Sequence, residues 1–250
     1  PAVRKHQQFC LTTLQGRKMT GVSASKFAFF LTNVEQLREP GRVFTLSAGD
    51  IELVNPNTRT APLFRTERDA ELAKAIYRRV PVLIRDGPPE QNPWGISFMR
   101  MFDMTNDSPY FRTRQELEGT GGVQDSLVFR CDAERYVKLF DPKMAQQFNH
   151  RAANLGLSGH QFRKISKEEV AVSELADPEF LPEPVYWIAE GHVNKRLGRW
   201  SQEWFVGFKD VTGTTSTALG VFTVIPRQGV GNKFPLMLST ADAPLQSLLL

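Results

Sequence analysis

The sequence predicts an α+β fold in which short antiparallel strands combine with a few helices. Short apolar runs at 43–46, 126–129 and 220–225 are followed within three residues by glycine, aspartate or proline, which is typical of strands. One stretch, 66–79, has the capping and charge pattern of a helix. The regular alternation of strands and helices that marks a parallel, doubly wound sheet is missing from the sequence.

Composition indicates a globular chain with a real hydrophobic core. The 250 residues are 41% hydrophobic, and the net charge of +4 is moderately basic, which permits polyanion binding without establishing it. Cys10 and Cys131 lie far apart, so neither a disulfide framework nor a metal site is indicated. There is no signal peptide and no run of about 18 apolar residues. We therefore expect a cytoplasmic protein without a membrane partner, and we interpret the chain as a piece of a longer protein.

The first part of the chain contains two predicted strands around a turn at Gly49, at 43–46 and 50–54. The stretch 25–34 fits helical and strand spacing equally well and stays undecided. Asn55 and Pro56 begin a turn. The same dipeptide opens the Asn-Pro-Pro-aromatic loop of amino-methylating enzymes, but Asn57 and Thr58 follow here, so no aromatic ring is present to stack a flipped base.

The stretch 66–79 is the clearest predicted helix. Thr66 is a suitable N-cap with Asp69 three residues later, and acidic residues come early while basic residues come late. Pro81 ends the helix, and 80–84 is a candidate for a short buried strand. Further along, we predict a strand over 134–140, a solvated polar connection over 156–177, and a strand over 220–225.

Candidates for catalysis and metal binding are weak. Asp103 and Asp107 lie four residues apart, and without further carboxylates they are expected to cap turns. Gly119, Gly121 and Gly122 lack the preceding strand and following helix of a nucleotide fingerprint. The histidines have neither a paired nucleophile nor metal-ligand spacing. They are His6, His150, His160 and His192.

The chemically densest stretch is Tyr136–Arg151. Pro142 suits the first position of a helix, and Met144 and Phe148 would then share one face. Amide, histidine and basic side chains crowd the rest of the segment. Such side chains hold phosphates and read base edges, so the segment is a candidate nucleic-acid contact. The loop 226–233, with Arg227 and Lys233, could present cations and backbone amides to a phosphate.

This stretch also resembles a segment found downstream of the methyltransferase core in large adenine-specific DNA methylases of restriction-modification systems. That family has Leu-Tyr-Glu-Ala-Lys-Met-Ile-His-Gln-Phe-Asp-His-Arg there. The positions that keep the pattern are Lys143, Met144, Gln147, Phe148, His150 and Arg151. Pro142, Gln146 and Asn149 depart from it, and Asn149 removes the aspartate of the family's aspartate–histidine pair.

Other short stretches resemble the same family, in the family's order, from Phe27 to Leu238. They include 53–58, 62–65, 68–71, 76–81, 92–94, 101–104, 106–108, 186–187, Trp204 with 207–210, 225–227 and 230–231.

The resemblance implies a role in DNA methylation without catalysis by this chain. In the family, an upstream domain uses S-adenosylmethionine to methylate adenine, and a downstream region recognises the target. We therefore expect no cofactor in this chain, S-adenosylmethionine in the parent protein, and double-stranded DNA and the upstream methyltransferase domain as partners. Residues 1–154 would form a connector, 155–182 a linker, and 183–250 an aromatic and basic β-rich region leading into target recognition.

The expected DNA contacts are Lys143, Gln147, His150, Arg151, Arg227 and Lys233. Two alternatives remain open. The chain could be a scaffold that packs on the methyltransferase domain without touching DNA, or an independent enzyme such as a hydrolase. The sequence does not reveal the recognition sequence, the presence of a nuclease domain or the oligomeric state.

Overall fold

The computed structural model describes residues 10–13, 23–125, 127–158, 164–212 and 220–241. The chain divides into two compact units, Pro1–Pro93 and Trp94–Leu250, here called the N-terminal and C-terminal units. Both combine short, mainly antiparallel strands with short helices, so the predicted α+β fold is confirmed. The division between Pro93 and Trp94 differs from the one expected within 155–182.

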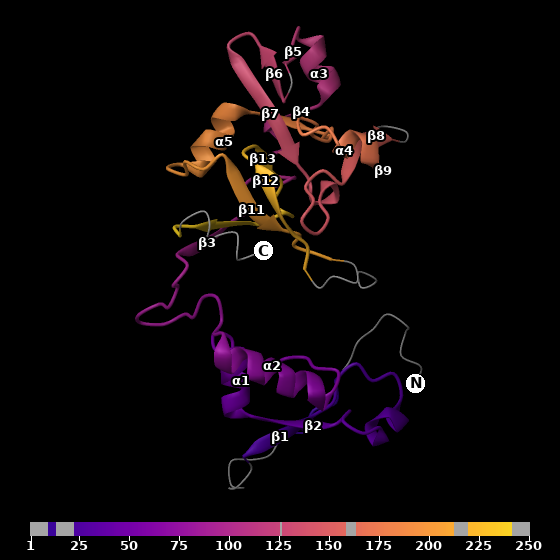
Figure 1. Cartoon of the computed structure of the whole chain (residues 1–250), viewed down its shortest axis with the longest axis vertical. Helices are drawn as coiled ribbons and strands as arrows, with labels where there is room; N and C mark the ends of the chain where they lie inside the picture. The colour runs from indigo at the N-terminus through magenta and orange to yellow at the C-terminus, as the bar shows by residue number, and fades with distance from the viewer. Residues whose placement is uncertain (1–9, 14–22, 126, 159–163, 213–219, 242–250) are drawn as a thin grey trace. The chain divides into compact units, whose positions relative to one another are not determined.

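The N-terminal unit is a two-stranded sheet covered by helices (Figure 1). Strands β1 (Ala24–Phe27) and β2 (Phe44–Ser47) pair antiparallel. They are accompanied by a 3₁₀ helix, η1 (Val34–Arg38), and by helices α1 (Ala48–Val54) and α2 (Glu67–Arg79). The core of this unit is formed by Phe44, Leu46 and Ala70, with Phe27, Phe29, Ile51 and Phe64 packed against them.

Helix α1 corrects the prediction of a strand over 50–54. The Ser47 hydroxyl accepts a hydrogen bond from the Asp50 N–H at 3.1 Å, and the Asp50 carboxylate accepts one from the Ser47 N–H at 2.9 Å. This reciprocal capping box satisfies two amide donors that a helix start otherwise leaves unpaired. The Ser47 N–H also holds the pKa of Asp50 below its usual value.

Helix α2 confirms the clearest helix prediction, with the Thr66 side chain accepting from the Asp69 N–H as its N-cap. The strand expected at 80–84 is absent, because the chain leaves the helix at Val80, which is 63% exposed, and forms only one isolated bridge, between Arg85 and Gln91. The Asn55–Asn57 turn is confirmed: the Asn57 side chain bonds the Ile84 carbonyl and the Asp86 N–H.

The C-terminal unit is built around strand β7 (Glu134–Phe140), the long strand that runs through the middle of this unit in Figure 1. The main sheet has the order β4-β10-β7-β6-β5, and β13 pairs with β7 as well. Its other strands are β4 (Phe111–Arg112), β5 (Val123–Asp125), β6 (Val128–Cys131), β10 (Trp187–Ala189) and β13 (Gly229–Val230).

A second sheet of four strands has the order β12-β11-β14-β3. The strands are β3 (Ile96–Met99), β11 (Trp204–Phe208), β12 (Phe222–Pro226) and β14 (Leu236–Ser239). One buried cluster contains residues from both sheets, among them Leu139 of β7, Ile188 of β10 and Ile225 of β12. The predicted strands at 126–129, 134–140 and 220–225 thus appear as β6, β7 and β12, although residue 126 lies outside the described residues.

The polar stretch expected to be a solvated connection is structured. Strands β8 (Ala153–Ser158) and β9 (Lys164–Glu169) pair antiparallel, and α4 (Val172–Leu175) follows. The hairpin is anchored by Leu155, which is buried in the main core, while most of β9 faces solvent. The hairpin was not predicted because its solvent-facing side is polar, although its other side packs on the main core. The remaining helices are η2 (Ser108–Tyr110), α3 (Arg114–Gly119), η3 (Pro142–Met144) and α5 (Glu190–Leu197).

The helix expected after Pro142 is a single 3₁₀ turn, η3. Met144 is buried, but Phe148 is 66% exposed and has a positive φ of 60°, so the two side chains do not share a helical face. The chain turns instead between Gln146 and Asn149, whose backbone groups bond each other in both directions at 2.7 and 3.0 Å. This turn gives the segment its irregular shape.

Gly229 allows β13 to lie parallel to β7. A Cβ atom at this buried position would approach Ile188 Cγ2 to 2.6 Å and Leu139 Cδ1 to 3.1 Å. Only a residue without a side chain lets the two strands and β10 pack this closely. Gly191 in α5 differs, because no atom lies within 4 Å of its built Cβ.

We expect Gly229→Ala and Gly191→Ala to change stability in opposite directions. Overpacking should make the first destabilising by about 1–3 kcal/mol, and the lower backbone entropy of alanine in the unfolded state should make the second stabilising by about 0.4–1 kcal/mol. All four tryptophans lie in the C-terminal unit, so urea unfolding followed by tryptophan fluorescence reports on that unit. Equal effects of the two changes would contradict the close approach at Gly229.

Candidate functional site

The structure places Gln147 and His150 beside strand β12. The Gln147 side-chain oxygen accepts a hydrogen bond from the Phe222 N–H at 2.9 Å, and the Phe148 N–H donates to the Phe222 carbonyl at 2.9 Å. His150 lies next to the Val224 backbone. The turn after β7 thus continues the edge of the second sheet, and Gln147 acts there as a structural amide.

Arg151 is anchored inside the protein. Its guanidinium donates to three backbone carbonyls, those of Asp177 at 2.7 Å, Leu175 at 3.1 Å and Phe180 at 3.3 Å. These carbonyls belong to the end of α4 and the irregular chain after it, where no strand supplies donors. The planar guanidinium, with five N–H donors, can bond several carbonyls at once. Arg151 therefore stabilises the loop after α4.

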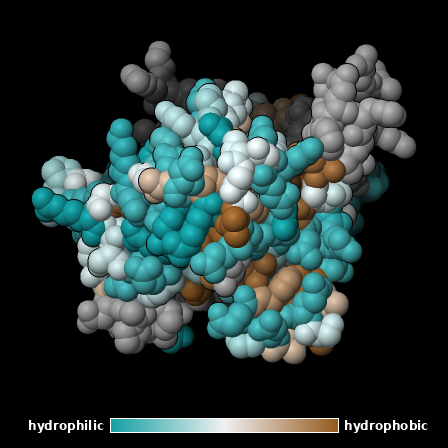
Figure 2. Space-filling model, turned by 90° about the horizontal axis from the view of Figure 1, so that it is seen from above, coloured by the Kyte–Doolittle hydropathy of each residue, from teal (hydrophilic) through white to brown (hydrophobic). Residues whose placement is uncertain are grey.

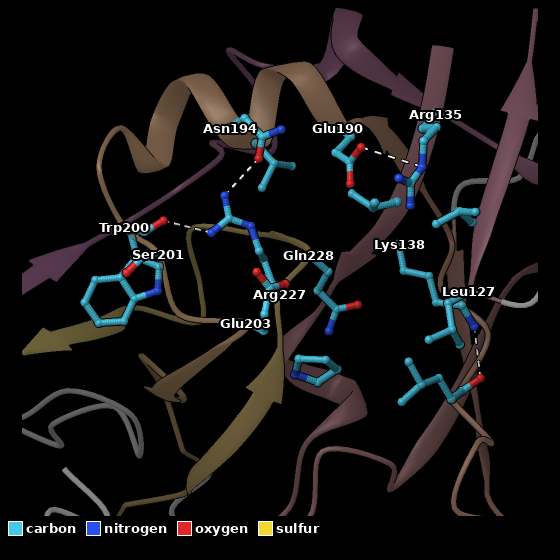
Figure 3. Close-up of a pocket in the computed structure, with 15 residues that line it drawn as sticks. Leu127, Arg135, Lys138, Glu190, Asn194, Trp200, Ser201, Glu203, Arg227 and Gln228 are labelled. Carbon is cyan, nitrogen blue, oxygen red and sulfur yellow. Dashed lines mark hydrogen bonds and ion pairs between the residues drawn. The ribbon is translucent and has the colours of Figure 1, made fainter. Parts of the chain in front are cut away.

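Arg227 has the same kind of role. It donates to the Trp200 carbonyl at 2.9 Å and to the Asn194 side-chain oxygen at 2.9 Å (Figure 3). A third hydrogen bond, of 3.4 Å, reaches the Gln202 carbonyl. These contacts tie the end of β12 to α5 and to the loop before β11.

Lys143 and Lys233 are the two expected contacts that face solvent. The Lys233 side chain is 62% exposed and lies 3.6 Å from the Asp210 carboxylate, which also forms a 2.8 Å ion pair with Arg100. Lys143 follows Asp141, whose carboxylate accepts from the Lys143 N–H at 2.8 Å. The six residues therefore do not form one patch of available cations and amides.

Two further cations, Lys167 and Lys209, lie near Asp141. Burial lowers the pKa of Lys209, at the end of β11, the positive charge of Lys167 in β9 lowers it further, and the negative charge of Asp141 raises it. Electrostatic influence of this kind requires the three groups to be neighbours. The sequence gives no sign of this grouping, because the three residues are separated by tens of positions.

His150 combines partial burial with an adjacent positive charge. Burial is the main cause that lowers its pKa, the charge of Arg151 lowers it further, and a hydrogen bond with the Val224 backbone raises it. The folded protein therefore disfavours the protonated imidazole. His6 and His160 lie outside the described residues, and the His192 ring lies 4.2 Å from the ring of Tyr110.

The two candidate acids are turn caps, as expected. The Asp103 carboxylate accepts from the Thr105 and Asn106 N–H groups at 3.0 and 2.8 Å. Asp107 accepts from the Asp103 N–H and pairs with Arg196 at 2.8 Å. Among the described residues, no group of three or more histidine, cysteine and acidic side chains is placed to hold a metal ion.

A cavity of about 540 Å³ opens beside Arg227 (Figure 3). Its wall comes from β6 and β7, from one face of α5 and from residues 226–228. The other lining residues are Leu127, Leu181, Trp200, Ser201 and Glu203. The sequence analysis missed this site except for Arg227, because its other residues are spread over the chain from Leu127 to Gln228.

The chain matches no protein-family model, no curated protein and no solved structure. Over the ranges that the structure describes, no helix is both long enough and apolar enough to cross a membrane. The face of the molecule in Figure 2 is mostly hydrophilic, with apolar residues visible in small separate areas.

We expect His150 to make stability depend on pH. Its folded-state pKa lies below that of the unfolded chain, so the unfolded state binds more protons as pH falls below about 6.5. The resulting destabilisation of the folded state is fully present below the folded-state pKa of His150. It disappears as pH rises to the pKa of His150 in the unfolded chain. When pH is lowered from 7.5 to 4.5, the free energy of unfolding measured with urea should therefore fall less for His150→Gln than for wild type. Parallel pH curves for the two proteins would show that His150 does not carry this effect.

Proposed function

We propose that the chain is a non-catalytic connector of a site-specific, S-adenosylmethionine-dependent DNA adenine methyltransferase that acts in restriction-modification or anti-phage defence. The observation that carries the proposal is the resemblance of the segment Tyr136–Arg151, accompanied by shorter matching stretches in the family's order. The cofactor and the methylated adenine would be bound by the upstream domain of the parent protein.

The placement of this segment supports a connecting role. It contains β7, the strand to which three others bond, and it continues into the turn that bonds β12. Gln147 and Arg151 hold neighbouring backbone in place there. The segment thus holds the two sheets of the C-terminal unit in fixed positions. A rigid segment of this kind suits a connector between two functional domains.

Direct DNA contact is the second part of the proposal, and it rests on exposed cations. Lys143 and Lys233 face solvent, and Lys167 and Lys209 lie near Asp141 on the Lys143 side. Gln147, His150, Arg151 and Arg227 would act indirectly, by holding backbone in place. Phosphates are bound by exposed cations of this type, with an affinity that falls as salt rises.

The scaffold alternative also has an observation in its favour. Arg151 and Arg227, two of the strongest candidate phosphate ligands, already donate to backbone carbonyls. Their replacement would disturb folding, so it cannot separate the two functions. Solvent-exposed lysines are the better test sites.

We expect the chain to bind duplex DNA weakly, with Lys143→Gln and Lys233→Gln each reducing the slope of log K against log salt by about 0.9 if each lysine contacts one phosphate. Lys195→Gln is the matched control, because Lys195 is an exposed cation on α5 that was not expected to contact DNA. Fluorescence anisotropy with a labelled duplex between 25 and 200 mM salt measures the slope. Salt-independent binding, or equal slopes for all three variants, would favour the scaffold.

Translation of the gene across both ends of these 250 residues tests the connector proposal itself. We expect an S-adenosylmethionine-binding glycine-rich loop and an Asn-Pro-Pro-aromatic tetrad in the same reading frame upstream. Start and stop codons close to both ends would contradict a covalent connector, and any methylation would then require a separate partner protein.

A further inference from the structure

The cavity beside Arg227 has the size of a small-molecule site. At about 540 Å³ it lies within the range of roughly 300–1,000 Å³ that is common for ligand pockets. Its wall exposes more polar than apolar surface, and the apolar part comes from residues such as Val128, Val137, Val193 and Pro226. The wall belongs entirely to the C-terminal unit, so its shape depends on one compact body.

The basic groups around the cavity already have partners, whereas the exposed carboxylate of Glu203 forms no ion pair among the described residues. Arg135 pairs with Glu190 at 3.7 Å, and the buried Lys138 ammonium donates to the Leu181 and Pro182 carbonyls at 2.9 and 3.0 Å. Arg227 donates to the Trp200 and Gln202 carbonyls and to the Asn194 side chain. An anionic ligand would have to compete with these internal bonds, so charge alone does not define the occupant.

Gln228 is different, because its side chain is buried and has no hydrogen-bond partner in the part of the chain that the structure describes. It exposes only 7% of its surface, and Figure 3 shows its amide in the cavity, between Arg227 and Lys138. The amide atoms are not among the fully buried polar atoms that lack a partner, so water in the cavity can reach them, and a ligand that pairs with the amide would replace that water. The amide offers an adjacent donor and acceptor in one plane.

Trp200 adds an aromatic side chain to the wall of the same cavity. Its indole N–H is also buried without a partner among the described residues. Aromatic rings favour flat partners, and the planar amide of glutamine pairs with the edge of a nucleobase through two hydrogen bonds. A flat ring that carries an adjacent donor and acceptor fits both features.

We propose that this cavity binds a nucleobase, with the Gln228 amide pairing to its hydrogen-bonding edge. The inference does not rest on the proposed connector function, because it uses only the cavity and its unpaired groups. A free nucleoside and a base within a single strand present the same edge, so both are sources to be distinguished by experiment.

The test measures binding of adenosine, of ribose and of a short single-stranded oligonucleotide to the 250-residue chain by isothermal titration calorimetry. We expect adenosine to bind and ribose not to bind. Gln228→Leu should weaken adenosine binding by roughly 5- to 100-fold, as expected for loss of a bidentate base contact. Gln146→Leu is the matched control, because Gln146 is exposed and lies outside the cavity wall.

Ser201→Trp provides a second variant that leaves Gln228 intact. Ser201 is exposed at the cavity, so a large side chain there should obstruct entry without disturbing the core. Circular dichroism confirms that each variant is folded. Loss of adenosine binding in Gln228→Leu and Ser201→Trp, with binding kept in Gln146→Leu, supports a site for free nucleosides.

Oligonucleotide binding that is lost in Gln228→Leu, without adenosine binding, assigns the same cavity to a base within a strand. Absence of binding by both probes at millimolar concentration overturns the proposal. So does equal binding by wild type and a folded Gln228→Leu variant.

Discussion

The C-terminal unit depends on the hydrogen bonding of strand β7. Strands β6 and β10 pair antiparallel with it on its two sides, and β13 pairs with its last residues in the parallel direction. The last four residues of β7 are buried, including Lys138. Strands from positions near 130, 188 and 229 are thereby held together, and the apolar cluster shared with the second sheet forms around them. The turn that follows β7 then connects this sheet to β12.

Much of the positive charge of the chain serves the backbone. Irregular segments carry carbonyl groups that no sheet or helix pairs, and burying them without donors is unfavourable. Basic side chains supply those donors in both units. The cations that donate to backbone carbonyls include Arg42, Arg112, Lys138, Arg151, Arg196 and Arg227. Hydrogen bonds to charged groups contribute about 1.5–3 kcal/mol each. A net charge of +4 therefore overstates how many cations are available to a polyanion.

This use of charge explains how far the sequence predicts the candidate site. Residue type marked Arg151 and Arg227 as candidate DNA contacts, but the backbone carbonyls that they bond lie 24 to 29 and 25 to 27 positions away. Only the folded chain brings such partners together. Lys143 and Lys233 remain the exposed members of the predicted set, and among the described residues neither ammonium donates to a backbone carbonyl.

The fold was predictable where the signal was local. Thr66 and Asp69 lie within one turn of each other, so their capping pattern identified α2 directly. The equivalent pair, Ser47 and Asp50, was outweighed by the alternation of Ile51 and Leu53, which suits a strand equally well. The β8–β9 hairpin was hidden for a different reason. Its outer face is polar, and the apolar contact of Leu155 that stabilises it comes from residues distant in sequence.

The cavity beside Arg227 follows from the same arrangement. Arg227, Lys138 and Arg135 all bond to groups at its wall, so their charges are largely compensated before any ligand arrives. What the wall leaves available is the neutral amide of Gln228 and the exposed carboxylate of Glu203, in surroundings that combine polar, apolar and aromatic groups. An anionic ligand would gain little there, because it would have to break existing bonds of the basic groups and lose its own hydration. A neutral, flat molecule loses less hydration and gains the contacts that the amide lacks. Selectivity for a nucleobase would then arise from the way the protein uses its cations to hold its own backbone.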